Sequence, residues 1–316
     1  MKIPAFIKLP CTIGVVAPSF GVSGERYIAN YEKAKQELIK EGFTIVECKS
    51  IYQLEKAQSN TPKNRAKELM KFYLDDKIDI VWSCAGGEIM NEILPYLDFK
   101  LLKQAKPKWF IGYSDNSNFC LPLATHAHIA SIYGMTITEY KTDQWIESSN
   151  DLIALLKNEK TVFTQYLDED TGVLPRKNIK LEGYLIGGTL DVITNLMETE
   201  YEKIREFSKG KKGKVLLFLE AYDYNILGVK RCLWQLNQAG YFNHIQGIIL
   251  GKLRISDPYF DVTLDEALKD LKLSIPIIYD VEVGHTYPTI PFVNGAYVNV
   301  EVKNKRFTIA YDFKHK

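Results

Sequence analysis

Residues 108–117 of the chain are KWFIGYSDNS, a short apolar run that ends in a glycine and a group of small polar residues. The run Lys108–Gly112 has the length and composition of a buried strand. Residues 113–115 then form a turn, and the chain from Asn116 onward has the pattern of a helix. A strand that passes through a tight turn into a helix is typical of an α/β fold with a parallel sheet.

The same alternation continues on both sides of this stretch. Three apolar runs of strand length come before it, and helical patterns follow them: 12–17, 43–48 and 78–84. Four more come after it, again separated by helical patterns: 181–186, 215–219, 245–250 and 275–283. The end of the chain, AYVNVEVKNKRFTIAY, alternates around a polar turn and predicts a β-hairpin. The sequence therefore predicts an α/β protein whose second half contains a mixed sheet.

A break in this pattern suggests how the domains are divided. A chain of 316 residues is long enough for two compact domains. Residues 166–180 carry scattered polar side chains, Gly172 and Pro175, with no clear period. We therefore expect an N-terminal domain over 1–165, a linker over 166–180 and a C-terminal domain over 181–316.

The composition excludes several classes of partner. Forty basic residues against 39 acidic ones leave a formal net charge of +1, which gives no reason to expect nucleic acid or an anionic membrane surface. No apolar stretch approaches the length of a membrane span, and the first ten residues lack the features of a signal peptide. The five cysteines are far apart and lie mostly in apolar runs, so we expect buried, reduced thiols and a cytoplasmic protein.

Ser114 is the first candidate catalytic residue. It lies in the strand-to-helix turn described above, which is the setting of a nucleophile elbow. Asn116 occupies the place of the second glycine in the usual motif, so the match is incomplete. The alternative is that Ser114 and Asp115 only cap the following helix.

Glu220 and His285 also come directly after apolar runs of strand length, in KVLLFLE and VEVGH. Side chains at the carboxyl ends of different strands can converge in an α/β fold. A hydroxyl, a carboxylate and an imidazole are the components of a hydrolytic triad. Each residue alone also has a structural explanation: Glu220 as an ordinary carboxylate at a strand end, and His285 as a surface histidine.

The other histidines offer no metal site. His126 and His128 are two apart on a predicted helix and so point in different directions.

Gly86 and Gly87 follow another predicted strand, and a glycine pair lets backbone N–H groups approach a ligand. Together with the N–H of Asp115 they are candidates to stabilise an oxyanion, although a plain turn is the alternative.

Several of these segments together resemble the LD-carboxypeptidase family of serine peptidases. They occur in the family's order over nearly the whole chain: GVVAPS, SCAGGEIMNEILPYLDF, FIGYSDNS, LEGYLIGGTLDVI, VLLFLEAYD and DVEVGHTYP. The resemblance implies a triad of Ser114, Glu220 and His285, with an oxyanion hole from the N–H groups of Gly87 and Asp115. It also implies an N-terminal flavodoxin-like domain, a C-terminal β-rich α/β domain, a triad at their interface and a homodimer.

One segment departs from the pattern of the cell-wall carboxypeptidases in this family. Those enzymes resemble GGYGxxR, whereas this chain has GGEIMNE, with Glu88 for the tyrosine and Glu92 for the arginine. An arginine there would suit a substrate carboxylate. Asn91 matches instead the segment of the microcin C immunity peptidases, the branch toward which the sequence leans. We count Gly86, Asn91 and Trp145 as candidate substrate contacts, the last by stacking on a base or ring. The alternative for Trp145 is that it packs on the domain surface.

The expected activity is therefore hydrolysis of an amide bond in a small peptide or peptide conjugate, without metal or organic cofactor. A muramoyltetrapeptide LD-carboxypeptidase is the alternative within the family. A non-catalytic two-domain ligand-binding protein is the alternative from another class. A nucleotide-dependent enzyme is disfavoured, because neither G-x-x-x-x-G-K-[ST] nor a strand followed by G-x-G-x-x-G is present.

Overall fold

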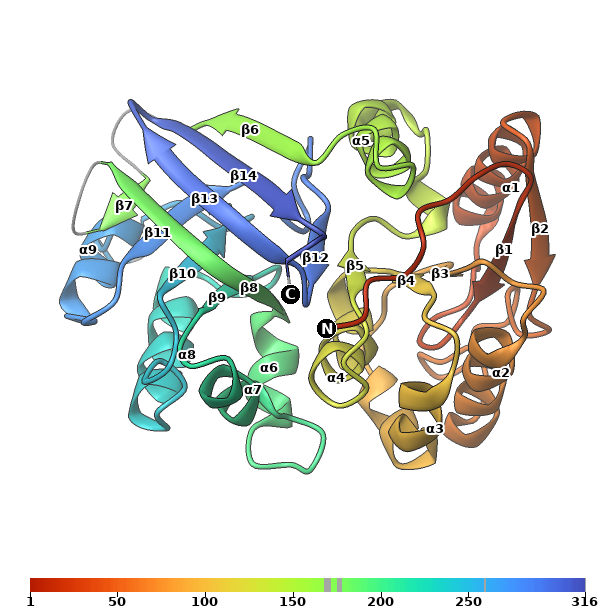
Figure 1. The fold of residues 1–316 in the computed structure, drawn as a ribbon, viewed down its shortest axis with the longest axis horizontal. Helices are drawn as coiled ribbons and strands as arrows, with labels where there is room; N and C mark the ends of the chain where they lie inside the picture. The colour runs from red at the N-terminus through yellow and green to blue at the C-terminus, as the bar shows by residue number, and fades with distance from the viewer. Residues whose placement is uncertain (168–171, 175–177, 259, 316) are drawn as a thin grey trace. The chain divides into compact units, whose positions relative to one another are not determined.

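The computed structural model describes residues 1–167, 172–174, 178–258 and 260–315. The chain forms two compact units (Figure 1). The first contains residues 1–160 and 290–294, and the second contains residues 161–289 and 295–316.

The first unit is built on a six-stranded sheet with the order β12-β5-β4-β3-β1-β2. Neighbouring strands are parallel, except that β12 runs antiparallel to β5. The strands are β1 (Cys11–Val16), β2 (Phe43–Glu47), β3 (Ile80–Ser83), β4 (Trp109–Ile111), β5 (Ser131–Tyr133) and β12 (Phe292–Asn294). The strands β1, β3 and β4 form the buried core, as the near-continuous apolar runs predicted.

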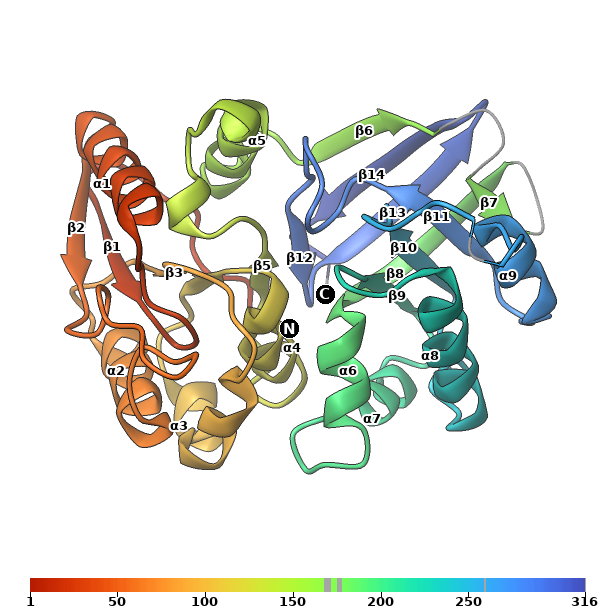
Figure 2. The ribbon, with the colours of Figure 1, turned by 180° about the vertical axis from the view of Figure 1, so that it is seen from behind.

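Helices cover both faces of this sheet. In Figures 1 and 2, α1 lies on one side of the strands and α2, α3 and α4 lie on the other. The helices of the unit are α1 (Glu25–Lys40), α2 (Pro62–Leu74), α3 (Phe99–Gln104), α4 (Ser117–Thr125) and α5 (Ile146–Leu156), with short 3-10 helices η1 (Met90–Tyr96), η2 (Ser114–Asn116), η3 (Ile137–Glu139) and η4 (Asp143–Trp145). Gly42 follows the end of α1 with a φ of 93°, a conformation that glycine adopts without strain.

The second unit contains an eight-stranded mixed sheet with the order β6-β14-β13-β8-β9-β10-β11-β7. The centre from β8 to β11 is parallel, whereas the outer pairs are antiparallel. The strands are β6 (Val162–Tyr166), β7 (Val173–Leu174), β8 (Ile179–Thr189), β9 (Val215–Glu220), β10 (Gly247–Gly251), β11 (Ile277–Val281), β13 (Tyr297–Lys303) and β14 (Arg306–Asp312).

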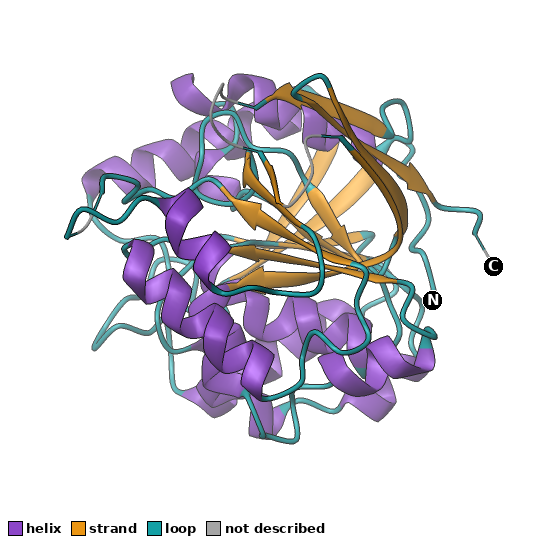
Figure 3. Ribbon diagram, turned by 90° about the vertical axis from the view of Figure 1, so that its left-hand side faces the viewer, coloured by secondary structure: helices purple, strands orange, loops and turns teal. Residues whose placement is uncertain are grey.

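Four helices accompany this sheet, and Figure 3 distinguishes the helices from the strands by colour. They are α6 (Leu190–Leu196), α7 (Ile204–Gly210), α8 (Ile226–Gln238) and α9 (Leu264–Asp270). The expected fold class is confirmed: one unit has a mainly parallel sheet, and the other has a β-rich mixed sheet that ends in the expected hairpin. Among the described residues, no helix combines the length and the apolar character needed to cross a lipid bilayer.

The division between the units differs from the expected one in two places. The segment expected to be a linker, 166–180, contributes β7 and the start of β8 to the second sheet, and β6 ends where this segment begins. Residues 168–171 and 175–177 of the segment lie outside the described part. Residues 290–294 return to the first unit, where β12 forms the edge of the sheet beside β5. Strands of two or three residues are too short to show a period, which explains why the sequence did not reveal them.

Candidate functional site

Ser114 lies at a strained turn between β4 and α4. Its φ is 61°, in the left-handed region that L residues other than glycine adopt at a cost of about 1–3 kcal/mol. A Cβ on Gly112 would lie 2.7 Å from Cγ of Asn116, so glycine is what lets the helix begin so close to the strand. The half-buried Ser114 therefore occupies the geometry of a nucleophile elbow rather than that of an ordinary helix cap.

The glycine pair after β3 lies against this turn. A Cβ on Gly86 would come 3.4 Å from Oγ of Ser114, so the backbone at residue 86 passes directly beside the hydroxyl. A Cβ on Gly87 would lie only 2.0 Å from Oγ of Ser19, in the loop after β1. Gly87 thus needs to be glycine, whereas a Cβ at Gly86 would make a tight contact of 3.3 Å with Cβ of Ser114. The first unit therefore brings the predicted oxyanion segment to the predicted nucleophile.

The side chain of Asp115 fastens this arrangement. It is 5% exposed, and its Oδ2 accepts hydrogen bonds from the Ser19 hydroxyl and, at 2.9 Å, from the backbone N–H of Met90. Its Oδ1 accepts from Nδ2 of Asn118 at 2.8 Å. Burial raises the pKa of Asp115, while these donors oppose the shift. One carboxylate therefore links the elbow, the loop after β1 and the segment that follows the glycine pair.

Glu92, which stands where the cell-wall enzymes have arginine, forms an ion pair with Arg65. The Oε2 atom of Glu92 lies 2.9 Å from a guanidinium nitrogen of Arg65, whose side chain is fully buried. The guanidinium also donates to the carbonyl oxygens of Pro18 and Ile89. This arginine therefore holds loops of the first unit together, and burial lowers its pKa. The neighbouring Asn91 is exposed on η1.

Glu220 and His285 form a directly bonded pair in the second unit. Glu220 is 1% exposed at the end of β9, and its Oε1 atom lies 2.9 Å from Nδ1 of His285. A carboxylate accepts hydrogen bonds only, so Nδ1 carries the hydrogen and the neutral imidazole keeps Nε2 as a base. Thr189 donates a second hydrogen bond to the same oxygen at 3.0 Å. The pair has the orientation of the acid and the base of a triad.

Gly284 allows the carboxylate and the imidazole to meet. Its φ is 88°, and a Cβ there would lie 2.6 Å from the carboxyl carbon of Glu220. The ring of Tyr222 also contacts the imidazole, with its centroid 4.3 Å from that of the His285 ring. The guanidinium carbon of Arg254 lies 4.4 Å from the centroid of the Tyr222 ring.

The sequence did not point to Thr189, Ser19, Arg65, Tyr222 or Arg254. Ser19, Thr189 and Tyr222 lie within segments that carry the family resemblance, but the sequence indicated no role for them. Their contacts depend on long-range packing, for which a single sequence carries no signal.

The sequence also singled out Trp145 and the histidines at positions 126 and 128. Trp145 is 4% exposed and packs edge-on against Tyr113 at 6.0 Å, which favours a packing role over ligand stacking. His126 follows the last residue of α4, and His128 lies beyond the helix with a φ of 56°, so the expectation that both lie on one helix was wrong. Among the described residues, no group of three or more potential ligands could hold a metal ion.

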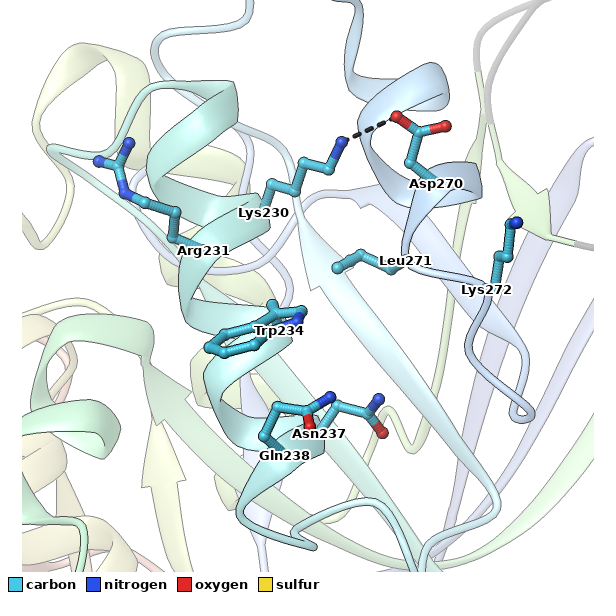
Figure 4. Close-up of a pocket in the computed structure, with 8 residues that line it drawn as sticks. All are labelled: Lys230, Arg231, Trp234, Asn237, Gln238, Asp270, Leu271 and Lys272. Atoms are coloured by element: carbon cyan, nitrogen blue, oxygen red, sulfur yellow. Dashed lines mark hydrogen bonds and ion pairs between the residues drawn. The ribbon is translucent and has the colours of Figure 1, made fainter.

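A surface cavity of about 390 Å³ lies beside α8 and α9 of the second unit (Figure 4). Trp234 contributes its ring, and Lys230 forms an ion pair with Asp270 at 2.8 Å. Neither Glu220 nor His285 lines this cavity, so it is separate from the bonded pair.

Comparison with known proteins gives the family. The model of the LD-carboxypeptidase N-terminal domain matches residues 13–134, and that of the C-terminal domain matches residues 182–300. The chain is 25% identical over 308 residues to the microcin C7 self-immunity protein MccF of Escherichia coli, covering 87% of this chain and 86% of the relative. It is 24% identical over 308 residues to the probable murein peptide carboxypeptidase of Bacillus subtilis, covering 94% and 91%.

The fold agrees with these relationships. A solved structure of MccF in complex with aspartyl sulfamoyl adenosine matches with a TM-score of 0.85 at 22% identity, over 99% of each chain. The two domain models together span most of the chain, and they match in the order that the motifs indicated. The chain therefore belongs to the LD-carboxypeptidase family and is a serine peptidase, a hydrolase by class.

Proposed function

We propose that the protein hydrolyses an amide bond of a small peptide or peptide conjugate, with Ser114 as nucleophile, His285 as base and Glu220 as the acid that orients the base. The observation that carries this proposal is the buried Glu220 carboxylate bonded to Nδ1 of His285 at 2.9 Å. A buried carboxylate with this partner stabilises the imidazolium that forms when the base takes a proton.

In the proposed mechanism, Nε2 of His285 takes the hydroxyl proton of Ser114 as Oγ attacks the carbonyl carbon. The negative charge that develops on the carbonyl oxygen is stabilised by the N–H groups of Gly87 and Asp115. The imidazolium then gives its proton to the leaving amine, and an acyl-enzyme remains. A water molecule, deprotonated by His285, attacks the acyl carbon and releases the carboxylic acid and the free hydroxyl.

We propose a peptidyl-aminoacyl nucleotide or a similar conjugate as the substrate, as in the microcin immunity branch. The ion pair between Glu92 and the buried Arg65 supports this choice, because it places an acidic residue where the cell-wall enzymes carry a cation. Two solved MccF complexes contain aminoacyl sulfamoyl nucleosides. The second candidate is a muramoyl tetrapeptide, because one relative that covers nearly the whole chain is a probable murein peptide carboxypeptidase.

The test of the mechanism uses a fluorophosphonate probe and both substrate types. We expect the probe to label Ser114 in the wild-type protein and to fail with His285→Ala, while the exposed His244→Ala serves as the matched control and labels normally. Ser114→Ala should lose turnover on whichever substrate the wild type cleaves, and product analysis then separates the two candidates. Full turnover by Ser114→Ala would remove the mechanism, and absence of both labelling and turnover in the wild type would favour a ligand-binding protein.

We further propose a homodimer in the cytoplasm. Sedimentation velocity of the full chain tests the first point, and fractionation of the producing cells tests the second.

A further inference from the structure

We propose that Arg254 and Tyr222 form an anion-binding subsite beside His285, and that it holds a negatively charged group on the leaving-amine side of the substrate. The assignment of the anion to the leaving-amine side of the substrate rests on the proposed function. The subsite itself lies wholly within the second unit.

Three neighbouring parallel strands bring these residues together. Tyr222 follows β9, Arg254 follows β10 and His285 follows β11. In the sheet β9 pairs with β10, and β10 pairs with β11. The carboxyl ends of parallel strands share one edge, which is where open α/β sheets bind ligands. The stack of guanidinium, phenol ring and imidazole is therefore a consequence of the topology.

The charge of Arg254 is not used inside the protein. Among the described residues, no carboxylate lies within ion-pair distance of its guanidinium. Two other arginines, by contrast, form ion pairs with carboxylates: Arg65 with Glu92 at 2.9 Å, and Arg205 with Glu198 at 2.6 Å. Arg254 is exposed, and its guanidinium carbon lies over the Tyr222 ring at 4.4 Å from the centroid, so the group is open to solvent and to a ligand. The planar set of guanidinium donors matches a carboxylate or a phosphate-type group.

The distances fit an anion on the leaving amine. The centroid of the Tyr222 ring lies 4.4 Å from the guanidinium carbon of Arg254 and 4.3 Å from the imidazole centroid of His285. The guanidinium carbon is therefore separated from the imidazole centroid by no more than the sum of these two distances. During proton transfer the leaving nitrogen is about 3 Å from Nε2. In an amino acid leaving group, the carboxylate carbon is about 2.5 Å beyond that nitrogen. A bidentate guanidinium carbon lies about 4 Å farther. These spans together reach the position of Arg254.

The ligand chemistry is thus an oxyanion close to the scissile nitrogen. It can come from the free α-carboxylate of a terminal amino acid, or from a phosphoryl or sulfonyl group bonded to the scissile nitrogen, as in an aminoacyl sulfamoyl nucleoside. Both put negative charge one or two bonds from the leaving nitrogen.

The test measures binding in the Ser114→Ala background, so that no turnover interferes. The probes are a muramoyl tetrapeptide with a free C-terminal carboxylate, the same peptide as its C-terminal amide, and aspartyl sulfamoyl adenosine. We expect Arg254→Gln to weaken binding of at least one anionic probe by about 10- to 100-fold and to leave the amide within about twofold. Arg254→Lys should recover part of the loss. Arg205→Gln is the matched control, because Arg205 also lies over a tyrosine ring, and it should change nothing.

A loss confined to the free-acid peptide identifies a terminal carboxylate, and a loss confined to the nucleotide analogue identifies a phosphate-type group. Equal weakening of acid and amide, or unchanged binding of all probes, would overturn the subsite. The proposed function has a separate test: it is wrong if Ser114→Ala in an otherwise unchanged chain keeps wild-type turnover. In that case the comparison of the free-acid peptide with its C-terminal amide still decides whether Arg254 binds an anion.

Discussion

Replacing Glu220 by glutamine tests the role of the bonded pair most directly. The side chain keeps its size at a site that is 1% exposed, so the packing around Gly284 is retained and only the charge is removed. In the wild type the carboxylate oxygen lies 2.9 Å from Nδ1 of His285. Because the charges are spread over the carboxyl group and the ring, their centres are about 4 Å apart, and at the effective dielectric constant of a protein site the attraction between carboxylate and imidazolium is then about 4 kcal/mol.

In the proposed mechanism the imidazolium forms only when His285 takes the proton of Ser114, so loss of the attraction would raise the barrier and leave substrate binding nearly unchanged. We therefore expect kcat of Glu220→Gln to fall about 10³-fold, with little change in KM. The assay is steady-state kinetics on the substrate that the wild type cleaves. Glu202→Gln is the matched control, because Glu202 is 3% exposed in the same unit and accepts its hydrogen bonds from Tyr241 and the backbone of Ile204. It should keep kcat.

A folded Glu220→Gln variant with kcat within about tenfold of the wild type would refute this reasoning, because removing a charge so close to the imidazolium should lower kcat by more than that. A fall of the same size in Glu202→Gln would also refute it, since the effect would then follow from any lost buried carboxylate.

Three further predictions concern stability, each measured by chemical denaturation. Gly284→Ala places a Cβ 2.6 Å from the Glu220 carboxyl at a φ of 88°, so the free energy of unfolding should fall by about 2 kcal/mol, whereas Gly210→Ala meets no atom within 4 Å and should not lower it. Ser114→Gly removes the strain of a φ of 61° and should raise the free energy of unfolding by about 1 kcal/mol while abolishing turnover; a loss of stability would contradict the strained elbow. Burial raises the pKa of Asp115, so the folded state keeps that proton to higher pH than the unfolded chain. The wild type should therefore lose stability as the pH rises from about 4 through the raised pKa, and Asp115→Asn should lack this slope.

Most of the fold could be predicted because its central strands are long apolar runs. The segments 12–17, 43–48 and 215–219 correspond closely to β1, β2 and β9, and glycines or small polar residues mark their ends. The strands β5, β7 and β12 were missed, since two or three residues cannot display a period and their pairing partners are distant in the chain.

The candidate site was predictable only in part. Ser114, Glu220 and His285 each follow a strand, and this position drew attention to them. The positive φ of Ser114 and the bond between Glu220 and His285 come from tertiary packing. The burial of Trp145 could not be foreseen either, because an aromatic residue in a polar segment is compatible with both a surface and a core position.

The return of residues 290–294 to the first sheet has a practical consequence for dissecting the protein. A fragment that stops at residue 160 would omit β12 and leave β5 as a bare edge, with the backbone groups of Ser131–Tyr133 open to pairing with other chains. Such a fragment is expected to self-associate. The five residues would have to be supplied, through a short engineered connection or as an added peptide, before the N-terminal half could be studied alone. No single cut in the chain therefore separates the two units, because the chain passes from the first to the second, back to the first and again to the second.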